Sequence, residues 1–257
     1  MASRTRRSRP KPVRESNLGA GAGSIADRIA ALFWPSLEST LEAQGFAITP
    51  QLLSPSECER LVALYNDDRH FRKRIVMGPL RFGEGEYKYF EAPLPGLVGE
   101  LRDSLYPRLA PVANRWALAM RQNSSFPPAL GDFLERCAAA GQIKPTPLLL
   151  RYGPGGYNCL HQDLYGEIAF PIQATIVLSR RGIDYDGGDF LLVEQRPRAQ
   201  SRGHAIDLEQ GCAILFANAH RPVASARGFY RVNMRHGVST ICCGQRLSLG
   251  IIFHNAK

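Results

Sequence analysis

The C-terminal half of the chain is a series of short apolar runs separated by turn residues, with no helical pattern between them. From Lys144 onward, Gly, Pro and Asp interrupt the sequence at short intervals. Parallel strands need long crossover connections, for which this pattern leaves no space. We therefore predict antiparallel strands that form a sandwich or barrel. The six predicted strands are residues 148–152, 168–178, 190–194, 212–217, 238–242 and 247–253.

The residues ahead of Lys144 follow a mainly helical pattern. Ser24 is a typical N-cap for a helix that extends to about Glu42, and Pro35 is expected to kink or split this helix. Ser54 and Pro55 start a second helix, with an acidic first turn. The second helix is predicted to end near Tyr65, and the remaining predicted elements are a short strand at 45–48 and helices at 96–120 and 129–140.

These patterns predict an α+β fold with a single domain over residues 24–257. We expect a helical layer, residues 24–143, packed on an antiparallel jelly-roll core (a double-stranded β-helix), residues 144–257. Residues 1–23 are rich in Arg, Pro, Gly and Ala and almost lack large apolar residues, so we predict a disordered tail there.

The net charge of the chain is concentrated in this tail. The chain carries +9, and residues 1–14 contain six basic residues and no acid, so the remainder carries only +3. A short basic arm suits contact with the phosphates of DNA or RNA, or with an anionic surface, and we expect its deletion to reduce the salt dependence of DNA binding. The alternatives are a solvated tail without a partner and an organelle transit peptide.

The cysteine pattern and the hydropathy of the sequence indicate the cellular compartment that we expect for the protein. The six cysteines include no CxxC pair, and neighbouring Cys242 and Cys243 are poorly placed to bridge each other, which predicts reduced thiols in a cytoplasmic protein. No apolar stretch approaches the ~18 residues of a membrane helix. We therefore expect no membrane span.

His161 and Asp163 form a His-x-Asp triplet that follows a Gly-rich segment. In an extended chain alternate side chains share a face, so both can point at one ion. Imidazole and carboxylate suit a divalent first-row metal, and a second histidine from a distant strand would complete a two-His, one-carboxylate site with open positions for oxygen and a cosubstrate. The alternative is a hydrogen-bonded His–Asp pair on a surface loop.

Arg246 lies at the start of the last predicted strand. Period-two geometry places Arg246 and Ser248 on one face of that strand, and Leu247 and Leu249 on the other. An arginine inside a small barrel is costly unless an anion meets it, and a guanidinium beside a hydroxyl matches a carboxylate. The alternative is an arginine at the rim, paired with an Asp of the protein.

The order and spacing of these residues resemble the Fe(II)/2-oxoglutarate oxygenase superfamily. His161-x-Asp163 is followed by His236 and, ten residues later, by Arg246-x-Ser248. The resemblance covers roughly residues 45–254, and residues 45–58 are similar to the helical entry of prolyl-hydroxylase-like members. Further matching features are Tyr152 before the Gly-rich turn, Gly187-Gly188-Asp189-Phe190 and Gly211.

The resemblance implies a dioxygenase that uses Fe(II), 2-oxoglutarate and O2. Such an enzyme couples decarboxylation of 2-oxoglutarate to insertion of oxygen into a substrate C–H bond; hydroxylation of an N-methyl group releases formaldehyde and so amounts to demethylation. The implied roles are Fe(II) ligation by His161, Asp163 and His236, binding of the distal 2-oxoglutarate carboxylate by Arg246 with Ser248, and a hydrogen bond from Tyr152 to the same cosubstrate.

His220 is the competing candidate for the distal histidine. Arg246 follows His220 by 26 residues but follows His236 by the ten residues typical of the superfamily, so we favour His236. Residues 152–163 are similar to the AlkB group, which removes alkyl lesions from nucleic acid bases. Leu150 and Ile252 depart from that group, which carries Asn and Arg at these positions. The whole chain more closely resembles a prokaryotic oxygenase family predicted to act on damaged DNA.

Several substrate classes remain open at this point. The basic tail, the Arg-rich loop at 195–202 and Tyr165, which we consider for stacking on an extruded base, favour DNA or RNA. A protein side-chain hydroxylase of the prolyl type and a small-molecule oxygenase are the alternatives. A non-catalytic nucleic-acid-binding protein on an oxygenase scaffold is the alternative from a different class, but such a protein has no use for both the ligand set and Arg246. The sequence does not predict the oligomeric state.

Overall fold

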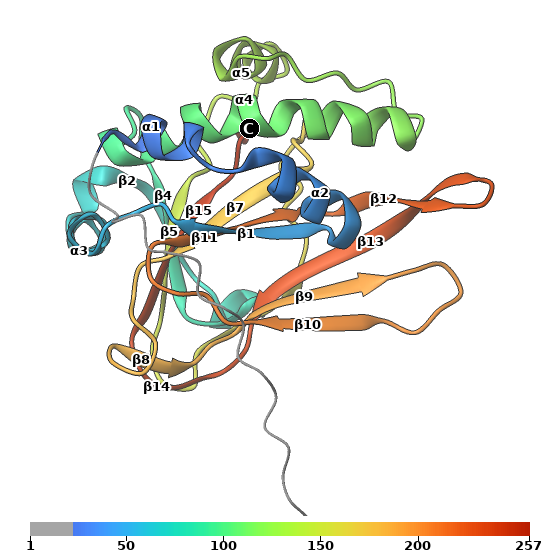
Figure 1. Ribbon diagram of the computed structural model, residues 1–257. Coiled ribbons are helices and arrows are strands. Elements are labelled where there is room, and N and C mark those ends of the chain that lie inside the picture. The colour runs from blue at the N-terminus through green and yellow to red at the C-terminus, as the bar shows by residue number, and fades with distance from the viewer. Residues whose placement is uncertain (1–22) are drawn as a thin grey trace, which may run out of the picture.

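Two antiparallel sheets, one above the other in Figure 1, form the centre of the protein in the computed structural model, which describes residues 23–257. The seven-stranded sheet has the order β1 (Phe46–Gln51), β11 (Cys212–Ala217), β7 (Ile172–Val177), β15 (Arg246–Ile251), β5 (Leu148–Tyr152), β4 (Glu86–Phe90) and β2 (Phe71–Val76). The six-stranded sheet has the order β10 (Arg202–Ile206), β9 (Phe190–Gln195), β13 (Gly228–Val238), β6 (Tyr157–His161) and β3 (Gly83–Glu84), with β12 (His220–Ser225) also paired to β13. β8 (Tyr185–Gly187) and β14 (Ile241–Gly244) form a two-stranded sheet.

A layer of helices covers the seven-stranded sheet (Figure 1). Its longest member, α4, buries Leu101, Leu105, Leu109, Val112 and Trp116, which recur at intervals of three and four and so form one apolar stripe. The helices are α1 (Ile25–Ala30), α2 (Trp34–Gln44), α3 (Pro55–Leu64), α4 (Gly96–Ala119) and α5 (Leu130–Ala139), with 3₁₀ turns η1 (Asp68–His70) and η2 (Gly78–Leu80).

The predicted helix starts are confirmed in detail. Ser54 accepts a hydrogen bond from the Glu57 backbone N–H, and the Glu57 carboxylate accepts one from the Ser54 N–H at 2.8 Å, which completes a capping box. Pro35 splits the first predicted helix: α1 ends at Ala30, and Pro35 occupies the first turn of α2, where its missing N–H costs no helical hydrogen bond. Gly45 ends α2 with a φ of 81°.

The α+β prediction with an antiparallel core is confirmed, but the division at residue 144 is wrong in one respect. The segment predicted as a helical layer, 24–143, contains β1, where a short strand was predicted, and also β2 to β4, which were not predicted. β1 pairs with β11, and β4 pairs with β5, so this segment extends the core sheet at both ends. In β4, charged and aromatic residues alternate with the period of two that the prediction missed, whereas β2 carries three consecutive basic residues and has no such alternation.

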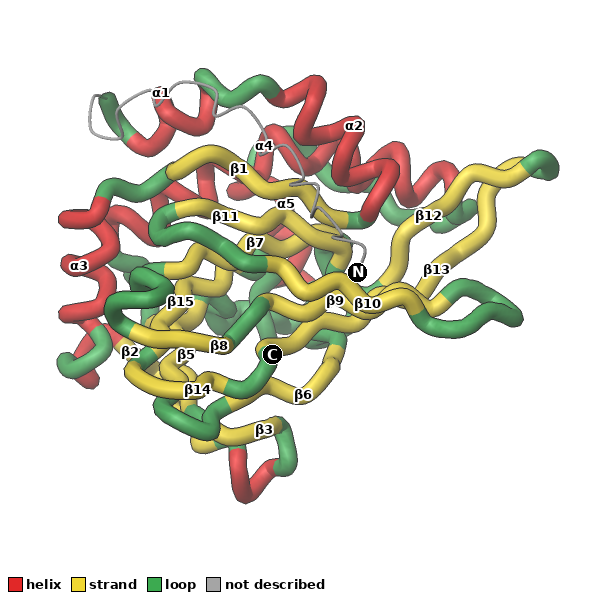
Figure 2. Tube along the Cα trace, turned by 60° about the horizontal axis from the view of Figure 1, so that its bottom comes forward, coloured by secondary structure: helices red, strands yellow, loops and turns green. Residues whose placement is uncertain are grey.

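The strand predicted at 238–242 is also wrong. β13 ends at Val238, a turn follows, and β14 begins at Ile241. β13 was not predicted because, apart from Phe229, the side chains at its exposed positions are arginines and asparagine. β12 and β13 form a hairpin that extends beyond the sheets beside the β9–β10 hairpin (Figure 2).

The predicted tail, residues 1–23, lies outside the described residues except for Gly23. All six cysteines are free. Within residues 23–257, no helix combines the length and the apolar character needed to cross a membrane.

Candidate active site

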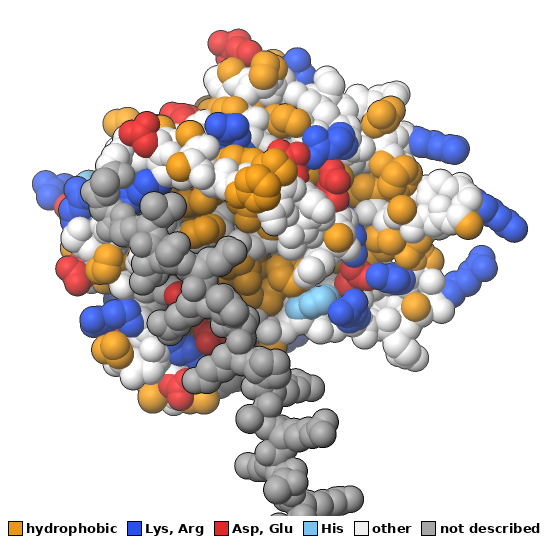
Figure 3. Space-filling view, viewed as in Figure 1, with side chains coloured by type: hydrophobic (Ala, Val, Ile, Leu, Met, Phe, Trp, Pro, Cys, Tyr) orange, Lys and Arg blue, Asp and Glu red, His pale blue; other side chains and the backbone are white. Residues whose placement is uncertain are grey.

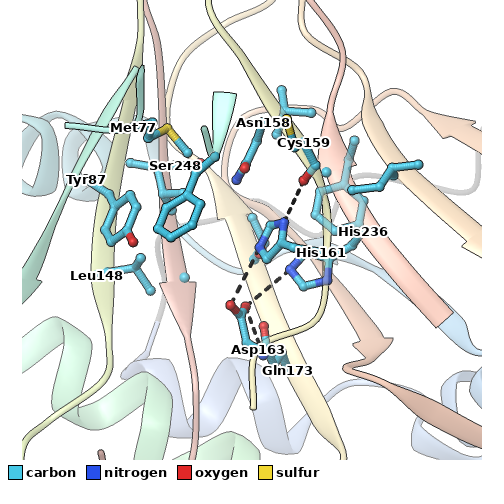
Figure 4. A pocket seen from close by; sticks show the side chains of 18 of the residues that line it. Met77, Tyr87, Leu148, Asn158, Cys159, His161, Asp163, Gln173, His236 and Ser248 are labelled. Atoms are coloured by element: carbon cyan, nitrogen blue, oxygen red, sulfur yellow. Dashed lines mark hydrogen bonds and ion pairs between the residues drawn. The ribbon is translucent and has the colours of Figure 1, made fainter. Parts of the chain in front are cut away.

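His161, Asp163 and His236 converge between the two sheets (Figure 4). Each offers one ligand atom, and these three atoms lie within 4.8 Å of one another. The Nε2 atoms of His161 and His236 lie 3.6 Å and 3.3 Å from the two Asp163 carboxylate oxygens. Two imidazoles and one carboxylate at this separation form the donor set that divalent iron takes in two-His, one-carboxylate centres.

Strand pairing brings these distant residues together. His161, the last residue of β6, lies directly opposite His236 of β13, and Asp163 follows two residues later. A hydrogen bond of 2.8 Å joins His161 Nδ1 to the Cys159 carbonyl, so this nitrogen carries the proton and the Nε2 lone pair faces Asp163. His161 is therefore held in the tautomer and orientation that metal binding requires.

The backbone of Asp163 is held by Asn218, which follows β11. The Asp163 N–H donates to Asn218 Oδ1 at 2.9 Å, and the Asn218 amide donates back to the Asp163 carbonyl. The neighbouring Gln162 donates to the carbonyls of Ala219 and Met234 at 3.0 Å and 2.8 Å. The loop that carries Asp163 is thus attached to both sheets, which limits its freedom to move away from the histidines.

Two further donors orient the Asp163 side chain. The Tyr165 hydroxyl donates to Asp163 Oδ1 at 2.7 Å, and Gln173 Nε2 donates to Oδ2 at 3.2 Å. Tyr89 in turn donates to the Tyr165 hydroxyl at 3.1 Å. The sequence suggested that Tyr165 stacks on an extruded base. Its hydroxyl contact indicates a different role, which is to orient the Asp163 carboxylate.

The electrostatics of the cluster favour an ionised carboxylate and a neutral imidazole. Burial by itself raises the pKa of Asp163, but hydrogen bonding with His236 and the charges of His236 and His161 outweigh it, so the pKa lies below the usual carboxyl range. Burial lowers the pKa of His236 despite its contact with Asp163. Deprotonated ligands are the forms that bind a metal ion.

Arg246 lies on β15 with its side chain buried in the same cavity; it is 1% exposed. Its Nη1 donates to Ser248 Oγ at 3.2 Å, while its Nε has no partner. Within the part of the chain that the structure describes, Arg246 forms no ion pair with a carboxylate. A buried guanidinium without an anion fits a ligand that brings a carboxylate of its own.

Tyr152 stands beside this guanidinium. It is the cross-strand partner of Arg246, and its ring centroid lies 5.9 Å from the guanidinium carbon. Its hydroxyl accepts a hydrogen bond from Asn158 at 3.2 Å, and burial raises its pKa to about 12. Tyr152 therefore keeps a proton that it can donate to a ligand bound by Arg246.

One cavity of about 370 Å³ joins the His–Asp–His cluster to Arg246 and Ser248. This volume lies in the range of small-molecule sites. Leu150 and Ile252 both line it, so the departures from the AlkB pattern put apolar surface where that group has polar side chains. The mouth is lined by exposed Arg81, Phe82 and Leu160.

The predicted residues are therefore brought together as expected, with the exception of the alternative His220. His220 lies on β12 and lines a different cavity beside Phe126 and Asn218. Sequence reasoning missed the supporting residues Asn218 and Gln173. Gln173 had a detectable signal, because it is an amide side chain in a buried, mainly apolar strand, whereas Asn218 directly after β11 had none.

The residues present fit an iron ion and 2-oxoglutarate. Two features carry this fit: a His–Asp–His ligand set with its tautomer fixed by Cys159, and the buried Arg246 with a free Nε in the same cavity. His236 Nδ1 also has no partner.

Comparisons with known proteins agree with this geometry. The family model for an oxygenase that catalyses oxidative methylation of damaged DNA matches residues 85–256. Uncharacterized proteins from two strains of Mycobacterium tuberculosis are 48% identical over 167 residues, which cover 65% of this chain and 72% of theirs.

Solved structures with the same fold are oxygenases. A Pseudomonas putida prolyl-4-hydroxylase has a TM-score of 0.52 at 14% identity, over 88% of this chain and 100% of its own. A Burkholderia pseudomallei oxidoreductase of the 2OG-Fe(II) oxygenase family has a TM-score of 0.51 at 17% identity, over 95% and 98%. A Trichoplax adhaerens prolyl hydroxylase has a TM-score of 0.55 at 13% identity, over 90% of each chain.

The predicted jelly-roll fold and the predicted cofactors, Fe(II), 2-oxoglutarate and O2, are those of the class to which these structures belong. The chain belongs to the oxygenase family linked to damaged DNA, and it is an enzyme of the Fe(II)- and 2-oxoglutarate-dependent dioxygenase class.

Proposed function

We propose that this dioxygenase oxidises an N-alkyl group on a damaged base of DNA and so removes the alkyl group. The observation that carries the proposal is the cavity in which His161, Asp163 and His236 face a buried Arg246 that has no carboxylate partner among residues 23–257. The family description supplies the link to damaged DNA. Hydroxylation of an N–CH₃ carbon gives N–CH₂OH, which releases formaldehyde and restores the N–H.

We assign the roles of the site residues as follows. Fe(II) and 2-oxoglutarate, when bound, would activate O2, which is the oxidant: one oxygen atom would enter succinate as 2-oxoglutarate loses carbon dioxide, and the other would enter the substrate C–H bond. Arg246 and Ser248 bind the distal carboxylate of 2-oxoglutarate, and Tyr152 donates a hydrogen bond to it. His161, Asp163 and His236 hold Fe(II), with Tyr165 and Gln173 keeping the carboxylate oriented.

The mouth of the cavity supports a nucleobase as the substrate. Phe82 and Leu160 line it and are 46% and 42% exposed, which leaves apolar surface free to stack on a planar base. Arg81 also lines the mouth, is exposed, and forms no ion pair or hydrogen bond through its side chain within the described chain. A cation beside an aromatic ring suits a base with its flanking phosphate.

The same cavity is built from both parts of the predicted domain. Met77 and Tyr87 come from the N-terminal segment, and His161, His236 and Arg246 come from the C-terminal one. We therefore propose that residues 24–257 act as one catalytic unit rather than as a catalytic core with a separable helical layer.

The test is formaldehyde release from N-methylated single- and double-stranded DNA oligonucleotides, together with Fe(II)-dependent formation of succinate. We expect both products from the full chain, and neither from the Asp163→Ala variant, which lacks the carboxylate ligand. Asp207→Ala removes an exposed carboxylate of the β10–β11 connection and should retain both activities. Succinate formation without formaldehyde from any oligonucleotide, alongside hydroxylation of a prolyl peptide, would replace DNA by a protein side chain as the substrate. Full turnover by Asp163→Ala would refute the proposed metal site.

A further inference from the structure

Two adjacent hairpins of the described chain carry six exposed arginines. They are β9–β10 and β12–β13, joined through pairing of β9 with β13. Blue side chains project from the edge of the molecule where Figure 1 places these hairpins (Figure 3). The exposed arginines are Arg196, Arg198 and Arg202 on the first hairpin and Arg227, Arg231 and Arg235 on the second.

Most of these arginines are not used by the fold. Arg196 pairs with Glu194 at 2.5 Å. The other five form no ion pair with any carboxylate in residues 23–257. The acid of this region, Glu194, is 2% exposed and turned inward, where it also pairs with the buried Arg221. The two hairpins therefore carry exposed positive charge without the acids that normally neutralise a solvated face.

The second hairpin also has the composition of a nucleic acid contact. Phe229, Arg231, Asn233 and Arg235 occupy alternate positions of β13 and are all exposed, so they form one stripe on its outer face. Phe229 is 59% exposed. A stripe of cationic, amide and aromatic side chains matches phosphates and unstacked bases.

We propose that this stripe and the β9–β10 loop bind the DNA backbone and guide it to the active site, an inference that rests on the proposed function. β13 connects the two places: the stripe lies on its outer face, and His236, five residues beyond Arg231, lies on its inner face. At about 3.4 Å per residue, Arg231 is about 17 Å along the strand from the metal cluster. At about 3.4 Å per phosphate along one strand of duplex DNA, this distance corresponds to roughly five nucleotides. A strand held on the hairpins can therefore present a base at the cavity.

The experiment measures binding of a fluorescein-labelled single-stranded DNA oligonucleotide by anisotropy at several salt concentrations. The variant is Arg198→Gln with Arg227→Gln and Arg231→Gln; all three residues lie outside the cavity. Each phosphate contact on a single strand contributes roughly 0.7 to the slope of log K against log salt. We expect the triple variant to bind about tenfold more weakly at low salt and to have a slope about 2 smaller in magnitude than the wild type.

A matched control removes the same charge elsewhere. Arg60→Gln with Arg69→Gln and Lys73→Gln changes exposed residues of α3, η1 and β2, on the far side of the molecule from the hairpins (Figure 1). This control should keep the wild-type slope. The inference alone fails if the wild type oxidises DNA but both triple variants share its slope. The inference and the proposed substrate fail together if the wild type neither binds nor oxidises the oligonucleotide.

Discussion

Two buried arginines show how differently this fold uses the same side chain. Arg221 on β12 is 2% exposed and pairs with the carboxylate of Glu194, which is equally buried. Arg246 on β15 is 1% exposed and has a hydroxyl, Ser248, as its hydrogen-bond partner. Both guanidinium groups have an Nε without a partner, so the difference lies in the carboxylate.

The comparison separates structure from function. A guanidinium that the protein neutralises with its own acid contributes to folding, because both charges are satisfied inside one chain. A guanidinium left without an acid keeps its desolvation cost until a ligand brings an anion. Because Arg246 opens into the cavity of the His–Asp–His cluster and Arg221 does not line that cavity, the 2-oxoglutarate carboxylate is the anion we assign to Arg246.

Of the substitutions considered, Arg221→Met is expected to have the largest effect, and the quantity that it lowers is the free energy of unfolding. It leaves the buried carboxylate of Glu194 with only the half-exposed Arg196 as a partner. Loss of one partner of a buried ion pair costs about 3 kcal/mol of the free energy of unfolding. Urea unfolding monitored by circular dichroism measures this cost, and the KM for 2-oxoglutarate of the folded variant should not change.

The double variant Arg221→Met with Glu194→Leu serves as the control for this prediction. Replacing both charges by apolar side chains removes the unpaired carboxylate, so most of the lost stability should return. A double variant as unstable as Arg221→Met alone would show that packing of the Arg221 stem, rather than its charge, supports the fold.

Arg246→Met should show the opposite behaviour. Without 2-oxoglutarate, the unfolding free energy should stay equal to that of the wild type or rise, because a buried charge without a carboxylate partner is removed. The KM for 2-oxoglutarate should rise about 100-fold, since two charge-assisted hydrogen bonds are lost, each worth roughly 1.5 kcal/mol. Steady-state succinate formation at varied 2-oxoglutarate measures the KM. A destabilised variant with an unchanged KM would place Arg246 in the same structural class as Arg221.

The sequence was most informative where a local rule acts alone. The helix start at Ser54 with its acidic first turn and the break at Pro35 each depend on neighbouring residues, and both appear where they were predicted. β4 and β13 were missed because charged residues take part in their alternating patterns, as buried residues in β4 and as exposed residues in β13, and pairing with β5 and β9 decides their conformation. β2 carries three consecutive basic residues and shows no alternation.

In the candidate site, too, some residues could be predicted from the sequence and others could not. The spacing of His161, Asp163, His236 and Arg246 identified the residues that converge, because their order along the chain resembles a known pattern. The support of Asp163 by Asn218 was not predictable, because the two residues lie far apart in the sequence and meet only when the sheets fold. Gln173 stands out in the sequence as an amide in a mainly apolar strand, but the sequence does not show that it contacts Asp163. Tyr165, two residues beyond Asp163, was noticed but given a different role.

The buried carboxylates of Glu194 and Asp163 can be compared in the same way as the two arginines. This comparison leads to the prediction with the smallest expected effect. Glu194 is held by arginines, whereas Asp163 is held by neutral donors, Tyr165 and Gln173, which leave its charge available to a cation. Burial and the charge of Asp163 both raise the pKa of Tyr165, so the hydroxyl keeps the proton it donates. Tyr165→Phe removes this hydrogen bond and should weaken Fe(II) binding by about 10-fold, the lower end of the effect of such outer contacts.

Titration of the protein with Fe(II) under anaerobic conditions measures this affinity, and thermal unfolding of the metal-free protein monitors the fold. Tyr87→Phe is the matched control: Tyr87 lines the same cavity but makes no hydrogen bond to Asp163. Equal Fe(II) affinity in wild type and Tyr165→Phe would mean that Gln173 alone orients the carboxylate. Equal losses in both tyrosine variants would instead trace the effect to cavity packing, because the two substitutions share only the removal of a hydroxyl from the same wall.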